Sequence, residues 1–184
     1  MEIRGKKVLL RDPIASDLED YALWDTVETE WQQWDAPWEC DEKEPEGESW
    51  WERQVRPLIG REIQAGELRR RFEICLLRGE HIGWVNSYYF GIDKQMLAIG
   101  MGIPSVTHRG KGHGRESFSL FIRYLLDNGI TGVYTQTWSG NIPMIKMAEN
   151  IGFYEIERVE GSRTVRGKEY DGLTFKLALK ELAP

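Results

Sequence analysis

The sequence predicts an α/β (α+β) fold in which helices flank one mixed, mostly antiparallel sheet of about six or seven strands. Residues 70–103 hold three strand-like runs separated by short polar turns, which is the pattern of an antiparallel meander. From residue 112 onward, segments with helical periodicity alternate with short apolar strands. The 184 residues contain no internal repeat, low-complexity tract or Gly/Ser linker, so we expect a single domain over 1–184.

The first third of the chain is predicted to contain one short strand followed by helices. A strand over 6–11 ends at Pro13. Ser16, with Glu19 three residues later, predicts a capping box for a helix that runs to about Trp24. The other elements expected here are helices over 26–34 and 48–65, the second interrupted at Pro57, and a loop over 37–47.

The rest of the chain is predicted to alternate between strands and helices. Apolar residues from Phe118 to Leu126 recur at the spacing of a helix that lies on a sheet, and Gly129 is expected to end it. Asn141 is expected to cap a helix that closes at Gly152. The helix that contains Phe118 is expected to start at 112. The other expected elements are strands over 70–77, 81–90, 96–103 and 133–137 and a final hairpin of 153–159 and 170–177.

Composition argues against several classes of protein. A net charge of −6 disfavours general nucleic-acid binding, which needs a basic surface. No segment approaches the roughly 18 apolar residues of a membrane helix, and the N-terminus lacks the features of a signal peptide. Cys40 and Cys75 match no metal or redox spacing, and the three histidines are scattered. We therefore expect a cytoplasmic protein without membrane, nucleic acid or metal.

An acidic, tryptophan-rich segment lies between Asp25 and Glu52. It holds eleven acidic residues against the single lysine Lys43, and five of the eight tryptophans, among them Trp31 and Trp34. One interpretation is a solvated acidic loop whose aromatic rings pack into the core. The other is a wall that attracts a cationic acceptor through its field and through cation–π contacts, with Trp31 and Trp34 as contact residues.

The run from Arg109 to Gly114 lies between a predicted strand and the most periodic helix. Its glycines allow positive φ angles and close approach of a ligand, and the first amides of a helix have no internal partner. These properties favour binding of phosphate oxygens. A Walker A loop would need Ser or Thr where Arg115 and Glu116 follow Gly114, and a dinucleotide fingerprint would need a glycine at position 115.

The remaining interpretation of this run is the pattern Arg-x-x-Gly-x-Gly, formed by Arg109, Gly112 and Gly114. In this pattern the chain resembles the GNAT superfamily of acyl-CoA-dependent N-acyltransferases. One strand downstream, the segment TWSGNIPMIKMAENIGF, from Thr137 to Phe153, resembles the family's next motif. The opening 9–11 and the ending 170–171 are similar to the subgroup that includes the ribosomal-protein N-terminal acetyltransferases.

The resemblance implies acetyl-CoA as co-substrate and a sheet that splays between the strands at 96–103 and 133–137. The pantetheine arm would bind the free main chain of the first of these strands, and Asn141 would contact the arm, cap its own helix, or do both. The amides after the strand would bind the diphosphate, with added charge from the basic side chains. The implied cofactor-binding residues are Met101, Gly102, Ile103, Arg109, Gly110, Lys111, Gly112, His113, Gly114, Arg115 and Asn141.

The catalytic residues are less clearly marked. Many relatives carry an acid in the strand before the glycine loop and a tyrosine seven residues after the asparagine, but 97–100 contains no acid and position 148 is Ala. Ser139 could protonate the departing thiolate, or only stabilise its turn. Glu73 could carry the acceptor's proton through water, or be an exposed strand residue. Tyr88 could reach the acceptor cleft.

These observations predict an acetyl-CoA-dependent N-acetyltransferase that acts by direct transfer to a primary amine. The acceptor would be a protein or peptide N-terminus or a small cationic amine, and the chain could act as a homodimer. Neither Cys40 nor Cys75 lies near the motif, so no covalent intermediate is expected. The alternatives are a non-catalytic acyl-CoA-binding module of the same fold, a transferase of longer acyl groups and, more distantly, a nucleotide-binding protein.

Overall fold

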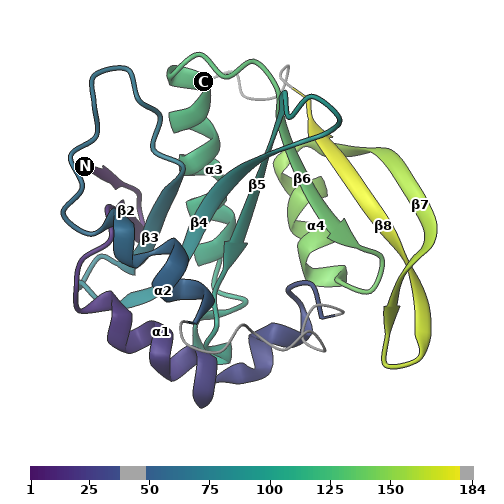
Figure 1. Ribbon diagram of the computed structural model, residues 1–184, viewed down its shortest axis with the longest axis horizontal. Helices are drawn as coiled ribbons and strands as arrows, with labels where there is room; N and C mark the ends of the chain where they lie inside the picture. Colours follow the sequence, from purple (N-terminus) through teal and green to yellow (C-terminus); the bar gives the residue numbers. More distant parts are fainter. Residues whose placement is uncertain (38–48, 179–184) are drawn as a thin grey trace.

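The computed structural model describes residues 1–37 and 49–178, which form one eight-stranded sheet in the order β1-β2-β3-β4-β5-β6-β8-β7 (Figure 1). All neighbouring strands are antiparallel except β5 and β6, which are parallel. The strands are β1 (Glu2–Arg4), β2 (Val8–Arg11), β3 (Arg71–Leu76), β4 (His81–Phe90), β5 (Met96–Gly102), β6 (Val133–Trp138), β7 (Phe153–Val165) and β8 (Lys168–Leu177).

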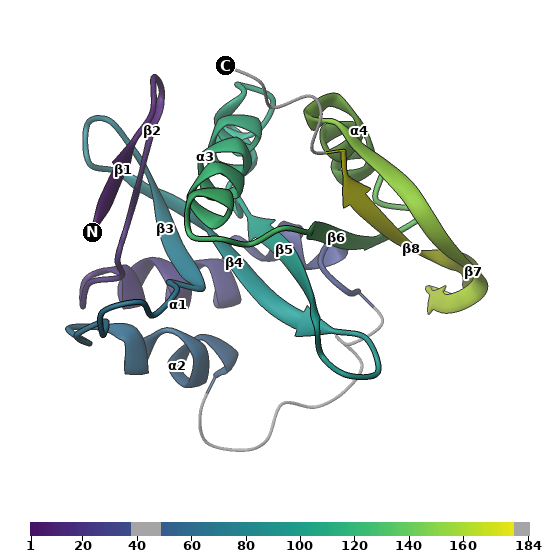
Figure 2. The same ribbon diagram turned by 90° about the horizontal axis from the view of Figure 1, so that it is seen from above.

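Helices cover both faces of the sheet (Figure 2). The longer pair, α3 (His113–Asp127) and α4 (Ile142–Ile151), lies on one face. The other face carries α1 (Asp17–Thr26) and the short α2 (Trp50–Gln54). Three 3₁₀ turns complete the described elements: η1 (Thr29–Gln33), η3 (Arg56–Leu58) and η4 (Val106–His108).

The main core lies between α3 and the sheet. Phe118, Phe121 and Leu125 are fully buried on one face of α3, as the helical spacing predicts. Phe121 meets the β3 residue Phe72 edge-on at 5.9 Å. Burial of one such aromatic side chain stabilises the fold by roughly 1.5–3 kcal/mol, so this stripe holds α3 and the loop before it in place.

A second, aromatic core lies under α1 and α2. Tyr21, Trp24 and Trp84 are buried, and Trp31 from η1 packs edge-on against Trp84 at 5.4 Å. Several tryptophans of the acidic segment therefore pack inward, as the first interpretation of that segment predicts. Trp38 and Cys40 lie outside the described residues.

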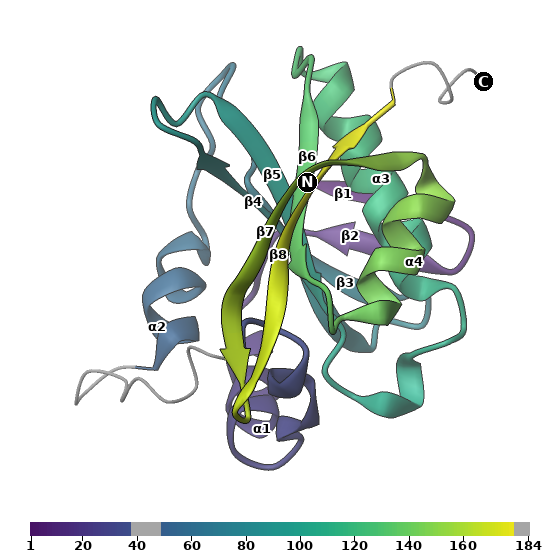
Figure 3. The same ribbon diagram turned by 90° about the vertical axis from the view of Figure 1, so that its right-hand side faces the viewer.

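The sheet opens between β5 and β6. Their pairing is limited to Leu97 with Val133 and Ala98 with Tyr134, after which the two strands diverge (Figure 1). The predicted splay between 96–103 and 133–137 is therefore confirmed. Figure 3 shows the tip of the β7–β8 hairpin beside the segment that follows α1, next to this opening.

Several predictions about individual elements are wrong. The sheet has an eighth strand because residues 2–4 pair with β2. The final hairpin is longer than the predicted strands 153–159 and 170–177, because both strands continue to a tight turn at Arg166 and Gly167. Ser16 makes no side-chain cap, and the predicted helix 48–65 contains only α2 and η3 within its described part, because Pro57 removes an amide donor.

No helix in the described ranges combines the length and apolar character needed to cross a bilayer. Cys75 is buried as a free thiol in β3, and burial raises its pKa to about 11. Such a thiol is a poor nucleophile near neutral pH, because the reactive species is the thiolate.

Candidate functional site

The loop before α3 presents a run of unpaired main-chain donors. Gly110 and Gly112 have φ angles of 70° and 83°, which side-chain-bearing residues rarely adopt. Among the described residues, the amides from Gly110 to Arg115 have no hydrogen-bond acceptor, and the first amide to be paired is that of Glu116. These donors lie at the positive end of the α3 dipole, an arrangement suited to binding phosphate oxygens.

Gly114 allows the start of α3 to lie directly against β5. A Cβ atom added there would be 3.1 Å from Met101 Cε and 3.5 Å from Ile103 Cδ1. This contact fixes the loop amides beside the last residues of β5, so the two halves of the predicted cofactor site adjoin.

The edge of β5 that faces the opening keeps free main-chain groups. Thr135 Oγ1 donates to the Ile99 carbonyl oxygen at 2.9 Å, which shows that Ile99 directs its main chain toward β6. Because main-chain groups alternate along a strand, Met101 faces the same side, beyond the last paired position of β6. Its amide and carbonyl can therefore pair with an extended ligand.

Arg109 is used differently from the expectation. Its guanidinium donates to the carbonyl oxygens of Ile103 at 2.8 Å and Pro104 at 2.6 Å and forms an ion pair with Glu30. Hydrogen bonding from Trp34 and from Arg109 holds the pKa of Glu30 below its usual value. In this arrangement Arg109 ties η1 to the loop, and its guanidinium is already occupied.

The sequence did not predict that two residues of the β1–β2 turn, Lys6 and Lys7, contact this site. Lys7 Nζ donates to the Lys111 carbonyl oxygen at 2.9 Å, and Lys7 N donates to Glu116 at 3.0 Å. Lys6 N also donates to Glu116. No sequence signal could have found these contacts, because they join positions more than 100 residues apart.

The other basic residues of the loop lie around its rim. Lys111 is exposed, and Arg115 donates weakly to the Asn150 carbonyl oxygen at 3.3 Å. His113 contacts the His108 carbonyl oxygen through Nδ1 at 3.1 Å. None of these contacts is strong enough to hold the Arg115 and Lys111 side chains away from an incoming phosphate.

Asn141 caps α4, as predicted, because its side chain accepts from Met144 N at 3.1 Å. Its amide nitrogen donates to the Trp34 carbonyl oxygen at 3.0 Å, and Trp138 Nε1 donates to the same oxygen at 3.0 Å. The segment after η1 is therefore joined to the end of β6 and to the start of α4.

Ser139 lies in the turn that follows β6. Its Oγ accepts from Asp171 N at 2.9 Å, and its own amide donates to the Asp171 carbonyl oxygen at 2.9 Å. The turn-stabilising interpretation of Ser139 thus has direct support. The hydroxyl proton stays available, since a serine that accepts one hydrogen bond can still donate another.

The predicted acceptor residues lie in different environments. Trp31 is only 8% exposed and donates to the Trp24 carbonyl oxygen at 2.9 Å, so it belongs to the aromatic core. Trp34 is half-buried at the edge of the opening. Tyr88 donates to Gln136 at 3.3 Å, and burial together with the charge of Asp35 raises its pKa to about 12.

Glu73 is fully buried among donors, so its interpretation as an exposed strand residue is wrong. It accepts from Tyr21 at 2.6 Å and Arg71 Nε at 2.9 Å, and His81 Nε2 lies 3.0 Å away. Burial alone would raise the pKa of Glu73, but Arg71, His81 and Tyr21 hold it below its usual value. A proton could reach this carboxylate from the cleft only through its neighbours.

The His81 imidazole lies in the same network. Its side chain is 3% exposed, with Nδ1 2.9 Å from Asp20 and Nε2 3.0 Å from Glu73. Burial lowers its pKa, but the contacts with Asp20 and Glu73 outweigh burial and raise the pKa from 6.5 to about 9. Near neutral pH the ring is therefore protonated, and both of its nitrogens can donate to the surrounding carboxylates of Asp20 and Glu73.

This pKa shift predicts a pH-dependent stability. The folded pKa lies above the unfolded one, so the contribution is fully present below pH 6.5 and is lost as pH rises to about 9. Its size is about 3 kcal/mol. Urea unfolding at pH 6 and pH 9 should show the loss in the wild type but not in His81→Gln. His108→Gln serves as a control that keeps it, and a slope that survives in His81→Gln would refute this assignment.

Comparison with known proteins places these features in a family. A family model described as an acetyltransferase (GNAT) domain matches residues 7–154. A search of curated proteins found no match.

Solved structures share the architecture. A GNAT-family acetyltransferase from Bacillus anthracis aligns with a TM-score of 0.64 and 15% identity over 96% of this chain and 98% of its own. RimL, a ribosomal L7/L12 α-N-protein acetyltransferase solved with coenzyme A, aligns with a TM-score of 0.69 and 13% identity over 96% and 97%. YncA from Salmonella typhimurium, solved with its cofactor acetyl-CoA, aligns with a TM-score of 0.53 and 20% identity over 62% and 66%. At these identities the likeness concerns the fold.

Proposed function

Because the chain belongs to the acetyltransferase (GNAT) domain family, we propose that it transfers the acetyl group of acetyl-CoA to a primary amine. The observation that carries this proposal is the run of unpaired amides from Gly110 to Arg115 at the start of α3, next to the open edge of β5. Acetyl-CoA joins a diphosphate to an extended, amide-bearing arm that ends in a thioester. The diphosphate matches the loop amides, and the arm matches the open edge of β5.

The diphosphate would bind the loop amides, where the α3 dipole and the rim charges of Lys111 and Arg115 favour anions. The pantetheine arm would pair with the Met101 main chain as an added strand. The thioester would then lie near the end of β6, where Ser139 and Asn141 are found.

The acceptor must be a neutral amine to attack the thioester carbon. A lysine-like amine with a pKa of about 10.4 costs roughly 4.6 kcal/mol to deprotonate at pH 7, whereas an α-amine near 8 costs only about 1.4 kcal/mol. As the N–C bond forms, the C–S bond breaks, the amine loses a proton and the CoA thiolate accepts one. The amine and acetyl-CoA react within one ternary complex, and the buried thiol of Cys75 takes no part.

We assign Ser139 the role of proton donor to the departing CoA thiolate. We expect Ser139→Ala to lower kcat about tenfold, the value of one hydrogen bond, with little change in the KM for acetyl-CoA. Ser162→Ala is the matched control, because Ser162 Oγ also accepts a main-chain amide, that of Gly172, at 2.9 Å. Equal kcat values for the two variants would remove Ser139 from the mechanism.

Release of the CoA thiol from acetyl-CoA in the presence of a panel of amines tests the proposed function. Amine-dependent release, together with an N-acetylated product identified by mass spectrometry, is the expected result. Tight acetyl-CoA binding without turnover on any amine would instead favour the non-catalytic acyl-CoA-binding module. Strong competition by ATP would indicate a nucleotide-binding protein.

A further inference from the structure

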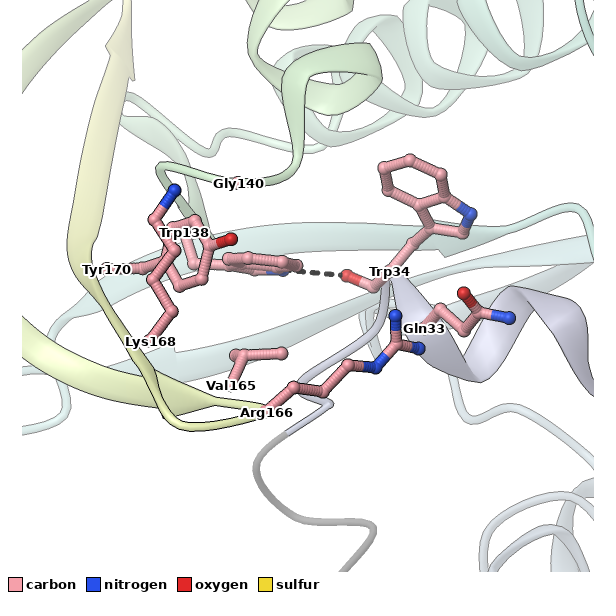
Figure 4. A pocket seen from close by; sticks show the side chains of 8 residues that line it. All are labelled: Gln33, Trp34, Trp138, Gly140, Val165, Arg166, Lys168 and Tyr170. Atoms are coloured by element: carbon pink, nitrogen blue, oxygen red, sulfur yellow. Dashed lines mark hydrogen bonds between the residues drawn. The ribbon is translucent and has the colours of Figure 1, made fainter.

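A pocket lies beside the proposed site of transfer, between the segment after η1 and the β7–β8 hairpin. It encloses about 360 Å³, and its aromatic walls are Trp34, Trp138 and Tyr170. Trp138 and Tyr170 meet edge-on at 4.8 Å. Figure 4 shows Trp138 and Tyr170 on one side and Trp34 on the other, with the Trp34 carbonyl oxygen facing Trp138 and Gly140 nearby.

The pocket adjoins the groups that the proposed function places near the thioester. Trp138 and Gly140 flank Ser139 in the chain, and both line the pocket. The Trp34 carbonyl oxygen joins the pocket wall to Asn141, which donates to it at 3.0 Å. An acceptor held here would therefore lie next to the turn that carries Ser139.

The described lining of the pocket carries positive charge. Its described lining includes Arg166 and Lys168 and no acidic residue. In the described ranges neither cation has a carboxylate partner, and Lys168 Nζ contacts only the Tyr170 ring, 5.0 Å from its centroid. Figure 4 shows Lys168 reaching toward Gly140 and Arg166 reaching toward Trp34, so the two charges of one hairpin lie at different sides of the pocket.

The backbone geometry at Arg166 determines where this turn places its side chain. Arg166 has a φ angle of 51° and is followed by Gly167 at 73°, which is the geometry of a two-residue hairpin turn. Such turns favour Asn, Asp or Gly at the first position, and a residue with a longer side chain is strained there. This turn places the Arg166 side chain in the lining of the pocket.

We propose that this pocket binds an acceptor that carries a carboxylate as well as its primary amine, a small molecule of the amino-acid class. This inference rests on the proposed acetyl transfer. The carboxylate is attracted by the positive charges of Arg166 and Lys168, the apolar part lies against the aromatic walls, and the amine is left free for the thioester. The carboxylate of this acceptor is negatively charged, whereas the acidic segment predicts a cationic acceptor.

The chemistry leaves the carboxylate unchanged. The amine nitrogen forms a bond to the acetyl carbon, the C–S bond breaks, and the amine proton is released as the thiolate becomes the CoA thiol. The products are an N-acetylated amino acid and free CoA, and no oxidant, reductant or further reactant is needed.

Matched acceptors test the substrate class. The probes are phenylalanine, its uncharged amide phenylalaninamide, and the polycation spermidine, each assayed with acetyl-CoA and the full chain. We expect kcat/KM for phenylalanine to exceed that for spermidine. We also expect Arg166→Asn and Lys168→Gln each to lower the ratio of phenylalanine to phenylalaninamide by about tenfold, the value of one charged hydrogen bond. Because this ratio is compared between protein variants, the different amine pKa values of the two probes cancel.

Lys94→Asn is the control for Arg166→Asn. Lys94 also has a positive φ angle, 48°, in an exposed turn after β4, and it does not line the pocket. Both substitutions relieve backbone strain, so both variants should melt at or above the wild-type temperature. Only Arg166→Asn should change the acceptor ratio, which separates loss of the charge from a change in the fold.

The outcomes divide clearly. An acceptor ratio that Arg166→Asn and Lys168→Gln leave unchanged, or faster transfer to spermidine than to phenylalanine, overturns the inference. If neither amine is acetylated, calorimetric titration of phenylalanine into the complex of the protein with CoA tests the inference instead. Binding that Arg166→Asn weakens supports the pocket, and absence of binding overturns it while the cofactor site stands. Failure to bind acetyl-CoA itself overturns the proposed function.

Discussion

Gly112→Val is expected to abolish binding of acetyl-CoA while leaving the protein folded. Gly112 has a φ angle of 83°, which a β-branched residue adopts only with strain. A Cβ atom at this position would also lie 3.2 Å from Lys7 Nζ. Relief of this strain requires rotation of the loop, and two lost hydrogen bonds to a phosphate amount to roughly 3–6 kcal/mol. Calorimetric titration should therefore show an affinity at least about a hundredfold weaker.

Gly129→Val controls for the backbone strain. Gly129 ends α3 with a φ angle of 85°, and a Cβ atom there would meet nothing within 4 Å. The two variants should lose comparable stability, because both place Val in the left-handed region. Only the variant at the start of α3 should lose the cofactor, and a folded Gly112→Val protein with wild-type affinity would contradict the assignment of the loop.

Glu73→Ala is expected to lower the free energy of unfolding by about 3–5 kcal/mol, the effect of removing one member of a buried ion pair. The variant leaves Arg71, whose side chain is 8% exposed, without its carboxylate. It also removes the acceptor of Tyr21 and one partner of His81. Urea unfolding near pH 7 measures the change.

Glu67→Ala is the matched control, because Glu67 forms an ion pair with Arg61 at the surface. Exposed pairs contribute up to about 1 kcal/mol, so this variant should stay close to the wild type. Glu73→Gln keeps the shape and part of the hydrogen bonding, and its loss should fall between the two. Equal stability of Glu73→Ala and Glu67→Ala would show that the buried network is not a structural element.

The arrangement of the sheet could be predicted because each strand and each long helix carries its own periodicity. Phe118, Phe121 and Leu125 mark the buried face of α3, and the turn residues mark the meander before it. The first strand and the extra length of the final hairpin were missed, since β1 has three residues and β7 is mostly exposed, with little apolar alternation. Such strands are held by pairing with a neighbour, which a single sequence does not show.

The glycine loop could be predicted because a positive φ angle and close packing both require glycine, at Gly112 and Gly114 respectively. The contacts of individual side chains could not be predicted. The ion pair of Arg109 with Glu30 and the hydrogen bond of Lys7 to the Lys111 carbonyl oxygen join distant parts of the chain. The burial of Glu73 was hidden for the same reason, because its partners Tyr21 and His81 come from other elements.

The pocket illustrates a further limit of sequence patterns. The acidic segment indicates a cationic partner when charges are counted along the chain. Among its described acids, however, Glu30 is engaged by Arg109 and Trp34, and Glu52 forms an ion pair with Arg56. Arg166 and Lys168 come from the opposite end of the sequence and supply the charge of the pocket. Charge in a pocket is set by the fold, because residues distant in the chain form its walls.

Calorimetric titration of acetyl-CoA into the full chain tests the central claim most directly, namely that the free amides at the start of α3 bind the diphosphate of an acyl carrier. The predicted result is saturable one-to-one binding that weakens as salt rises and disappears in Gly112→Val. Absence of binding at millimolar acetyl-CoA, with the protein shown to be folded, would contradict it.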